Sequence, residues 1–521
     1  MNSTSLARSV VRQLIEIGVS DFVLSPGSRN APLSMALYAA EQAGLVNLYV
    51  RIDERGAAFF ALGLSKASDN YVAVICTSGT AAANFHPAVL EAHHSENKLL
   101  AITADRPARL RRTGANQTTL QVGLLEPVLS VDISATVDLA ELLDSGPVHL
   151  NIQFDEPLLS DDRTDWLAGW SPRAQAHFKS LEQGSFYPKK KGLVIVGHDR
   201  AGIDKESIAA FAATLGWPII AEDPLSFPTS MAHAVLTLSD PEVRAAMMPD
   251  QVVVIGRPTL SRSISALISE CGDVVVIDSR INTIDTERRA AQSFDSLPSA
   301  ATNSDTTWFD RWQQVSIAAG GTIELEWSEQ EAIRSITSNI PDGAALFVGS
   351  SRPVRDIEAF ATPRSGITTF ANRGLAGIDG NISCAFGIAE KFERTYAVMG
   401  DITFLHDISA LVNPVEANLT IFIIDNNGGG IFSTLPQSGV DGFEKIFGTP
   451  HDLDLVKVIQ GFGMNAIKVK GVTDLEHVIA HRASGLNFVV VEVPDRATNA
   501  QMLRNVVQSL ISALRIGSNL A

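Results

Sequence analysis

Two stretches in the last third of the chain, TYAVMGD (395–401) and LTIFIIDNNGGG (419–430), decide the fold. Each is a short apolar run that ends in polar residues beside glycine, which is typical of a parallel strand buried on both faces of a sheet. Since ligands bind at the carboxyl ends of parallel strands, we expect these polar residues to form a site. Asp401 offers a carboxylate, Asn426 an amide oxygen and Gly428 a backbone carbonyl, which are oxygen ligands of the kind that Mg²⁺ prefers.

Each half of this pattern also has an ordinary structural explanation. Asp401 could simply cap a helix, and the Asn-Asn-Gly run could be only a turn. The two halves together, each after a buried strand, favour a site for a metal ion and a diphosphate, because the glycine-rich turn also presents N–H groups to phosphate.

The same alternation of apolar runs and helix patterns continues through the whole chain of 521 residues, which is too long for one core. Two polar breaks, EQGSFYPKKKG at 182–192 and the segment 301–329, divide the series. We predict an α/β protein with three doubly wound parallel-sheet domains, at residues 1–183, 184–335 and 336–521.

Composition excludes several classes of partner. The net charge is −17 without a run of Lys or Arg, which argues against nucleic acid and anionic membranes as general partners. The sequence has neither a signal-peptide pattern nor an apolar run of about 18 residues, so we expect no membrane span. Cys76, Cys271 and Cys384 lie far apart in apolar surroundings, which indicates buried thiols and a cytoplasmic protein.

Arginines gather at the predicted strand ends, although the protein is acidic. They are Arg29, Arg106, Arg355 and Arg373. A guanidinium binds a carboxylate through two parallel hydrogen bonds, so these positions predict an anionic, carboxylate-bearing substrate. The alternative is that each arginine pairs with a nearby acid, as Arg106 could with Asp105.

The Gly-Asp pair, the length of the span after it and the Asn-Asn pair resemble the thiamine diphosphate motif of pyruvate-oxidase-like enzymes. The third glycine usual in that motif is replaced by Ile402. Over essentially its whole length, and more loosely in the middle third, the chain resembles the family of 2-succinyl-5-enolpyruvyl-6-hydroxy-3-cyclohexene-1-carboxylate synthases. The motifs that carry this resemblance are SPGSRNAPL (25–33), IDERGAAFFALGLSK (52–66), TSGTAAAN (77–84), TADRP (103–107), GANQ (114–117), NRGLAGIDG (372–380) and DNNGGGIFSTLP (425–436).

The resemblance implies pyrimidine-binding, central and diphosphate-binding domains, in that order. It also implies thiamine diphosphate with Mg²⁺ (or Mn²⁺) as cofactors. The expected reaction is decarboxylation of 2-oxoglutarate and 1,4-addition of the resulting succinyl semialdehyde carbanion to isochorismate, in menaquinone or phylloquinone biosynthesis. The expected assembly is a homodimer or a dimer of dimers.

Residue roles follow from the resemblance, position by position. Glu54 would be the catalytic acid-base group against the aminopyrimidine of the cofactor. Without the resemblance, Glu54 could simply be an acid at a helix N-terminus that the helix dipole favours. Ile378 would be the wedge beneath the bent cofactor. The other expected cofactor contacts are Ser351, Asn426, Gly428, Ile431 and Phe432, and the expected metal ligands are Asp401, Asn426 and Gly428. The expected substrate contacts are Ser28, Arg29, Arg106, Gln117, Arg355, Arg373 and, with a surface role equally possible, Arg262.

Two other functions stay open from the sequence. One is a different decarboxylating thiamine enzyme, such as an acetolactate synthase relative, although pyruvate has one carboxylate and would not need four arginines. The other is a scaffold that binds a diphosphate ligand, which would have no need of Glu54.

Overall fold

The structure is a computed structural model of the chain, and it describes residues 2–143, 146–162, 164–172, 185–280, 285, 289–302, 305–481 and 483–516. The chain forms two compact units. The first consists of Met1–Phe178, Gly374–Glu393 and Thr403–Asn418, and the second of Lys179–Arg373, Arg394–Ile402 and Leu419–Ala521. The predicted boundary at residue 183 lies outside the described residues.

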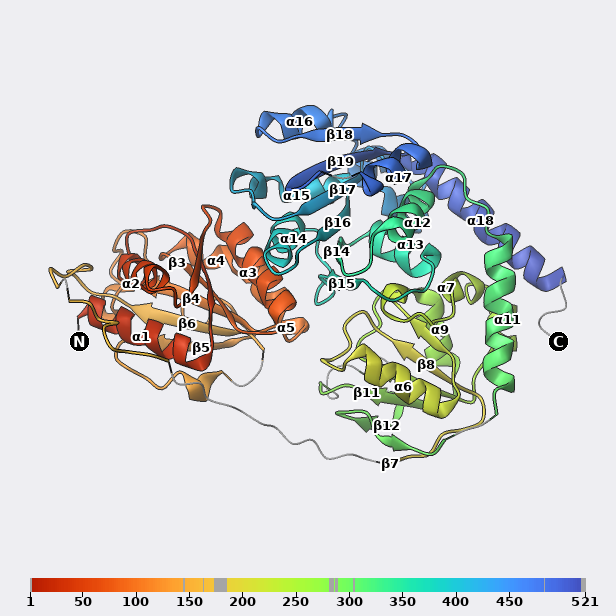
Figure 1. Cartoon of the computed structure of the whole chain (residues 1–521), viewed down its shortest axis with the longest axis horizontal. Coiled ribbons are helices and arrows are strands. Elements are labelled where there is room, and N and C mark those ends of the chain that lie inside the picture. The colour runs from red at the N-terminus through yellow and green to blue at the C-terminus, as the bar shows by residue number, and fades with distance from the viewer. Residues whose placement is uncertain are drawn as a thin grey trace. The chain divides into compact units, whose positions relative to one another are not determined.

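The first unit is built on a six-stranded parallel sheet with the order β2-β1-β3-β4-β6-β5 (Figure 1). Its strands are β1 (Asp21–Leu24), β2 (Asn47–Val50), β3 (Val72–Cys76), β4 (Leu99–Asp105), β5 (Leu129–Ile133) and β6 (Val148–Gln153). Its helices are α1 (Ser3–Ile17), α2 (Ala31–Gln42), α3 (Glu54–Ser68), α4 (Thr80–Asn84), α5 (His86–His94) and α14 (Asn381–Ala389), with short turns η1 (Ala108–Leu110), η2 (Ala140–Leu142) and η4 (Ile408–Val412).

The second unit contains a six-stranded parallel sheet with the order β15-β14-β16-β17-β19-β18. Its strands are β14 (Ala345–Val348), β15 (Thr368–Ala371), β16 (Thr395–Gly400), β17 (Leu419–Asp425), β18 (Ala466–Val469) and β19 (Leu486–Glu492). Counted along the chain, this is the same strand order as in the first sheet. In both sheets the order reverses between the first and third strands, and such a reversal marks a ligand-binding crevice.

A five-stranded parallel sheet from the middle of the chain completes the second unit, in the order β12-β11-β10-β8-β9. Its strands are β8 (Gly192–Val196), β9 (Ile219–Ala221), β10 (Gln251–Ile255), β11 (Val274–Ile277) and β12 (Ala290–Phe294), and a separate pair is formed by β7 (Ser185–Phe186) and β13 (Ser299–Ala300). Three parallel sheets interleaved with helices confirm the predicted α/β class.

The second unit carries most of the helices. They are α6 (Lys205–Leu215), α7 (Ala234–Thr237), α8 (Pro241–Ala246), α9 (Arg262–Glu270), α11 (Thr307–Thr322), α12 (Glu329–Asn339), α13 (Arg352–Phe360), α16 (Leu455–Gly461), α17 (Val472–Ala480) and α18 (Arg496–Ile516). The short turns are η3 (Pro224–Ser226), η5 (Gly430–Thr434) and η6 (Glu444–Gly448), and α15 (Asp401–His406) begins directly after β16. The predicted domain boundary at residue 335 falls within α12.

Local sequence explains where the helices begin and end. Helix α1 begins after Asn2, whose side chain accepts a hydrogen bond from Ser5 N–H, and ends at Gly18 in the left-handed conformation at φ 101°.

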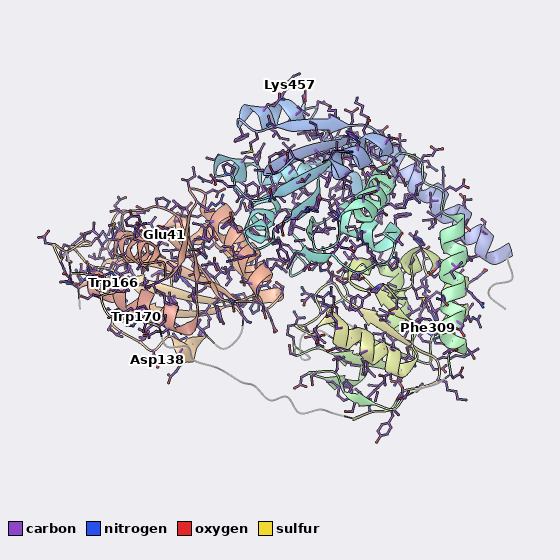
Figure 2. All side chains as sticks on the ribbon, viewed as in Figure 1. Glu41, Asp138, Trp166, Trp170, Phe309 and Lys457 are labelled. Atoms are coloured by element: carbon purple, nitrogen blue, oxygen red, sulfur yellow. The ribbon has the colours of Figure 1, made fainter. Side chains whose placement is uncertain are left out.

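Helix α1 also carries Arg12, whose guanidinium lies 5.2 Å and 5.6 Å from the ring centroids of Trp166 and Trp170, both labelled in Figure 2. No helix among the described residues is both long and apolar enough to cross a membrane.

Candidate active site

The three predicted metal ligands lie together at the carboxyl edge of the sheet in the second unit. Strands β16 and β17 pair in parallel up to Gly400 and Ile424, so Asp401 and Asn426 follow neighbouring strands. The Gly428 N–H donates to Asp401 Oδ2 at 2.8 Å. Asp401 is 2% and Asn426 7% exposed, so the cluster is buried.

The amide of Asn426 has one end bonded and one end open. Its Nδ2 donates to Glu329 Oε1, whereas its Oδ1 is buried and has no hydrogen-bond partner among the described residues. Such an oxygen is costly unless a ligand binds it. Gly430 makes room for this arrangement, because a Cβ there would lie 2.4 Å from Asn426 Nδ2. A buried carboxylate beside an open amide oxygen fits a hard divalent cation such as Mg²⁺.

Glu329, the first residue of α12, is a buried neighbour of this cluster that sequence reasoning missed. Burial, and then the negative charge of Asp356, raise the pKa of Glu329 to about 7. Its backbone N–H donates to Asn499 Oδ1 at 2.9 Å. Glu329 is 97 residues before Asn426, and nothing in the sequence near it indicates a site.

His451 and Asp425 were also missed, and with Asp401 they form a group whose potential ligand atoms lie within 4.8 Å of one another. His451 Nδ1 accepts a hydrogen bond from Leu453 N–H at 3.0 Å, so the ring proton sits on Nε2, which lies 3.3 Å from Asp401 Oδ2. The hydrogen bond to Asp401 raises the pKa of His451. In this tautomer His451 orients the Asp401 carboxylate as a donor and does not itself ligate a metal.

The predicted arginines Arg355 and Arg373 lie near each other in the second unit. Burial, and then the positive charge of Arg373, lower the pKa of Arg355. Two buried carboxyl groups face them: burial raises the pKa of Glu222, and burial with the Glu222 charge raises that of Glu358 well above its ordinary value. This region therefore concentrates cations whose charge is balanced in part by carboxyl groups inside the protein.

The other predicted residues of the second unit occupy element ends. Ser351 precedes α13 in the left-handed region at φ 75°, and its carbonyl accepts a hydrogen bond from Arg355 Nη1 at 2.6 Å. Arg262 is the exposed first residue of α9. Ile431 and Phe432 lie half-buried in η5, directly after the glycine turn.

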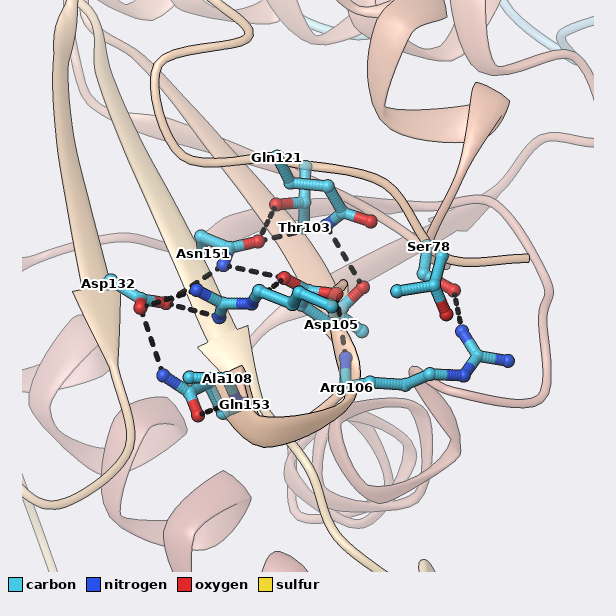
Figure 3. A network of polar contacts seen from close by, with 12 residues as sticks. Ser78, Thr103, Asp105, Arg106, Ala108, Gln121, Asp132, Asn151 and Gln153 are labelled. Atoms are coloured by element: carbon cyan, nitrogen blue, oxygen red, sulfur yellow. Dashed lines mark hydrogen bonds and ion pairs between the residues drawn. The ribbon is translucent and has the colours of Figure 1, made fainter. Parts of the chain in front are cut away.

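In the first unit, a second polar cluster lies at the carboxyl ends of β3 and β4. Arg106 Nη1 donates to Ser78 Oγ at 2.8 Å and to the Gln117 carbonyl at 2.7 Å, as Figure 3 shows for Ser78. Arg29 Nη1 donates to the Phe154 carbonyl at 3.1 Å. Burial, and then the charge of Arg29, lower the pKa of Arg106, so the two predicted substrate arginines of this unit lie near each other.

Two further predicted residues lie in the same loops. Ser28, directly before Arg29, is exposed. Gln117 adopts φ 53°, and its Nε2 donates to the Ser78 carbonyl at 3.0 Å. Gln117 and Ser78 therefore hold one another beside Arg106.

Asp105 does not supply the ion pair that the sequence offered as an alternative role for Arg106. Its Oδ1 accepts only the backbone N–H of Arg106, at 2.7 Å, and its Oδ2 pairs with Arg111 Nε at 2.8 Å. Arg111 also binds both carboxylate oxygens of Asp132 at 2.7 Å. This network, seen around Asp105 and Asp132 in Figure 3, leaves the Arg106 side chain directed away from Asp105 towards Ser78.

Glu54 is the first residue of α3, as the sequence predicted. The preceding Asp53 caps the helix by accepting a hydrogen bond from Arg55 N–H at 3.1 Å. Asp53 therefore caps α3, and Glu54 lies in the first turn of the helix, where the helix dipole also favours an acid. The Glu54 carboxylate has no hydrogen bond of its own among the contacts that the structure describes, and the side chain is half-buried.

Ile378 lies in a loop of the first unit whose start is held by a buried acid that sequence reasoning missed. The Glu91 carboxylate accepts hydrogen bonds from three consecutive backbone N–H groups, at 2.6 Å from Gly374, 2.7 Å from Leu375 and 3.3 Å from Ala376. Glu91 is only 3% exposed. The Ile378 side chain is half-buried two residues further along.

Comparison with known proteins matches three family descriptions to successive parts of the chain. Residues 4–124 match "Thiamine pyrophosphate enzyme, N-terminal TPP binding domain", residues 160–348 "Middle domain of thiamine pyrophosphate", and residues 351–493 "Thiamine pyrophosphate enzyme, C-terminal TPP binding domain". These matches confirm the predicted three-domain fold of the thiamine diphosphate enzymes.

Curated relatives match over almost the whole chain. A protein of Nocardioides sp. is 40% identical, with 98% of both chains covered, and one of Thermobifida fusca is 35% identical, with 98% of this chain and 100% of the relative covered. A protein of Lysinibacillus sphaericus is 33% identical, with 99% of both chains covered. All three carry the name 2-succinyl-5-enolpyruvyl-6-hydroxy-3-cyclohexene-1-carboxylate synthase.

Proposed function

From the premise that the chain belongs to the family of 2-succinyl-5-enolpyruvyl-6-hydroxy-3-cyclohexene-1-carboxylate synthases, we infer that it is a thiamine diphosphate-dependent transferase of menaquinone (or phylloquinone) biosynthesis. It decarboxylates 2-oxoglutarate and adds the remaining four-carbon unit to isochorismate in a 1,4-addition. The observation that carries this function in the structure is the buried Oδ1 of Asn426, without a hydrogen-bond partner among the described residues, at the carboxyl edge of the sheet where Asp401 follows the neighbouring strand.

The metal ligands are the first part of the proposal. Asp401, Asn426 and Gly428 would hold Mg²⁺ or Mn²⁺, and the ion would bind the diphosphate of the cofactor. His451 supports this assignment because its Nε2–H orients the Asp401 carboxylate. Ile431 and Phe432 lie in η5, directly after the glycine turn that contains Gly428, and would contact the cofactor. Ser351 would also contact the cofactor.

Thiamine diphosphate, when bound, supplies the carbanion chemistry that a side chain cannot. Glu54 would hold and return a proton at the aminopyrimidine ring. Its position supports this role, since Asp53 already caps α3 and leaves the Glu54 carboxylate available. Ile378 would set the bent shape of the cofactor.

The arginines would bind the carboxylates of the two dianionic substrates. Arg29 and Arg106, with Ser28 and Gln117, form the group in the first unit, and Arg355, Arg373 and Arg262 form the group in the second. Burial, and then the charge of the neighbouring arginine, lower the pKa of Arg106 and of Arg355. This supports an anionic ligand, because a bound carboxylate would relieve the repulsion between neighbouring guanidinium groups.

We further propose a cytoplasmic homodimer or dimer of dimers, with the three cysteines as buried free thiols. Two-fold symmetric dimers are the commonest soluble oligomers. We expect such a dimer here because the cofactor of this family needs both an acid-base group and a metal site. Sedimentation equilibrium would show a single-chain mass if this assembly is wrong.

The function is tested by incubating the protein with thiamine diphosphate, Mg²⁺, 2-oxoglutarate and isochorismate, and by identifying the product by mass. We expect Glu54→Gln to keep cofactor affinity within about tenfold and to lose turnover by at least about 10²-fold, the scale of one acid-base group. Glu41→Gln on α2 is the matched control and should leave turnover unchanged. Carbon dioxide release from pyruvate but not from 2-oxoglutarate would instead assign a different decarboxylating activity.

A further inference from the structure

The middle segment of the chain, which forms the five-stranded sheet, contacts the predicted substrate residue Arg373 through the loop that follows β10. Gly256–Ser261 connects β10 to α9, and Thr259 of this loop accepts hydrogen bonds from Arg373 at its Oγ1, 2.8 Å from Nη2 and 3.3 Å from Nε. Arg257 Nη2 donates to the Arg373 carbonyl at 2.6 Å. The loop therefore holds Arg373 by both its side chain and its backbone.

The loop is itself fixed from inside the middle segment. Glu222, which is 4% exposed, accepts hydrogen bonds from the backbone N–H groups of Thr259 and of Leu260, the latter at 2.6 Å, and from His198 N–H at 3.0 Å. Gly256 allows the loop to approach the β8 end closely, since a Cβ there would lie 1.9 Å from the Asp199 carbonyl oxygen. A buried acid that binds three backbone donors makes this loop a rigid support.

A second contact joins the middle segment to the same edge of the third sheet. Thr369, in the edge strand β15, donates to Asp223, which directly follows Glu222. Arg373 lies two residues beyond the end of β15 at Ala371. The middle segment therefore braces both the edge strand and the arginine that follows it.

We propose that Thr259 is a positioning residue for substrate binding, which orients the Arg373 guanidinium towards a carboxylate of the substrate, and that this bracing is what the middle segment contributes to the reaction. The inference rests on the proposed function, because it takes Arg373 as a substrate contact. Two hydrogen bonds from the guanidinium to one hydroxyl fix the plane in which Arg373 can meet a planar carboxylate. Arg262, three residues after Thr259, begins α9 directly after this loop.

The test compares three variants in steady-state kinetics with each substrate varied in turn. Thr259→Val keeps the shape and the backbone N–H to Glu222 but removes the hydroxyl. We expect it to raise the KM of at least one of the two carboxylate substrates by about three- to tenfold, the net scale of one ordinary intramolecular hydrogen bond, with kcat and thiamine diphosphate affinity within about twofold. Thr259→Ser, which retains the hydroxyl, should restore the KM.

Thr214→Val is the matched control, because the Thr214 hydroxyl bonds only to the Ala210 carbonyl within α6 of the same segment. It should change neither KM. The proposal is overturned if Thr259→Val leaves both KM values unchanged, if Thr259→Ser behaves like Thr259→Val, or if kcat and cofactor affinity fall by more than about twofold while KM rises. Failure of the proposed function is a separate result, since the wild-type protein would then not turn over the two substrates at all.

Discussion

Asn426 is oriented for a ligand before any ligand binds. Its Nδ2 donates a hydrogen bond to Glu329, and Gly430 leaves space for this contact. Its Oδ1 therefore points away from Glu329, and it has no hydrogen-bond partner among the described residues. Asp401 is fixed in the same way by the donors Gly428 N–H and His451 Nε2. Preorganised ligands of this kind reduce the cost of assembling a metal site.

We expect Asp401→Ala to abolish the Mg²⁺ dependence of thiamine diphosphate binding, because the only side-chain carboxyl group among the three proposed ligands is lost. The dissociation constant should rise by at least about tenfold in the presence of Mg²⁺, the scale seen when a metal site loses supporting groups. Calorimetric titration with and without Mg²⁺ measures this. Asp474→Ala on α17, an exposed acid, is the control, and an unchanged Mg²⁺ dependence in Asp401→Ala would remove that residue from the site.

The position of Asp401 and Asn426 at one edge of the sheet was predictable from sequence, but the residues that contact them were not. Asp401 and Asn426 follow apolar strands directly, and parallel strands bring their carboxyl ends to one edge. Glu329 contacts Asn426 across 97 residues of chain, and Thr259 contacts the substrate arginine Arg373 across 114. A local pattern carries no trace of such contacts. His451 lies in a loop without periodicity.

At the scale of elements, the first unit depends on the close approach of α3 and α14. Gly63 and Gly387 lie at their crossing: a Cβ on Gly63 would lie 2.1 Å from the Cys384 carbonyl oxygen, and one on Gly387 would lie 2.1 Å from the Phe60 carbonyl oxygen. Both partners are backbone atoms, which cannot rotate away. Helix α3 also carries Glu54 at its first turn, so this packing fixes the direction from which the acid is presented.

Gly63→Ala should destabilise the protein, because the added methyl group must separate the two helices. We expect a loss of about 1–3 kcal/mol in the free energy of unfolding, as for other overpacked sites. Gly461→Ala at the end of α16 is the control, since nothing lies within 4 Å of its Cβ position, and it should be neutral or slightly stabilising. Equal melting temperatures for the two variants, measured by calorimetry, would contradict the tight crossing.

Strand prediction succeeded where an apolar run forms, and this includes the edge strands β2, β9 and β15. The central strands were found because they are apolar on both faces. The missed strands include β5, β12 and β18 at sheet edges, where most side chains are exposed or half-buried and no continuous apolar run forms. The identical strand order of the two six-stranded sheets is a property of pairing between distant segments, and the sequence pattern alone does not contain it.

At the scale of the whole molecule, stability towards acid is tied to a neutral histidine in the first sheet. His149 on β6 is fully buried, and burial lowers its pKa from 6.5 to about 4. Its Nδ1 lies 2.8 Å from Ser130 Oγ and its Nε2 lies 2.8 Å from Thr103 Oγ1. Thr103 donates to Asn151 Oδ1 at 2.9 Å, so its oxygen accepts from Nε2–H, and the neutral ring satisfies both neighbours.

The sign of the pH dependence follows from the direction of this pKa shift. The unfolded chain takes up a proton on His149 near pH 6.5, whereas the folded chain does so only near pH 4. The contribution of His149 is therefore complete above pH 6.5 and is lost as the pH falls from 6.5 to 4. The pKa difference corresponds to about 3 kcal/mol of folding free energy.

His149→Gln should flatten this acid sensitivity, because an amide does not titrate. We expect the variant to be less stable than the wild type at pH 7.5, where the buried imidazole network is intact, and to lose less further stability between pH 7.5 and 5. Hydrogen exchange of the β4 and β6 backbone amides at both pH values reports the opening free energy of this sheet. His481→Gln, at the exposed C-terminal end of α17, is the control and should retain the wild-type dependence. If His149→Gln and the wild type lose the same free energy between pH 7.5 and 5, the acid sensitivity of the sheet comes from other groups.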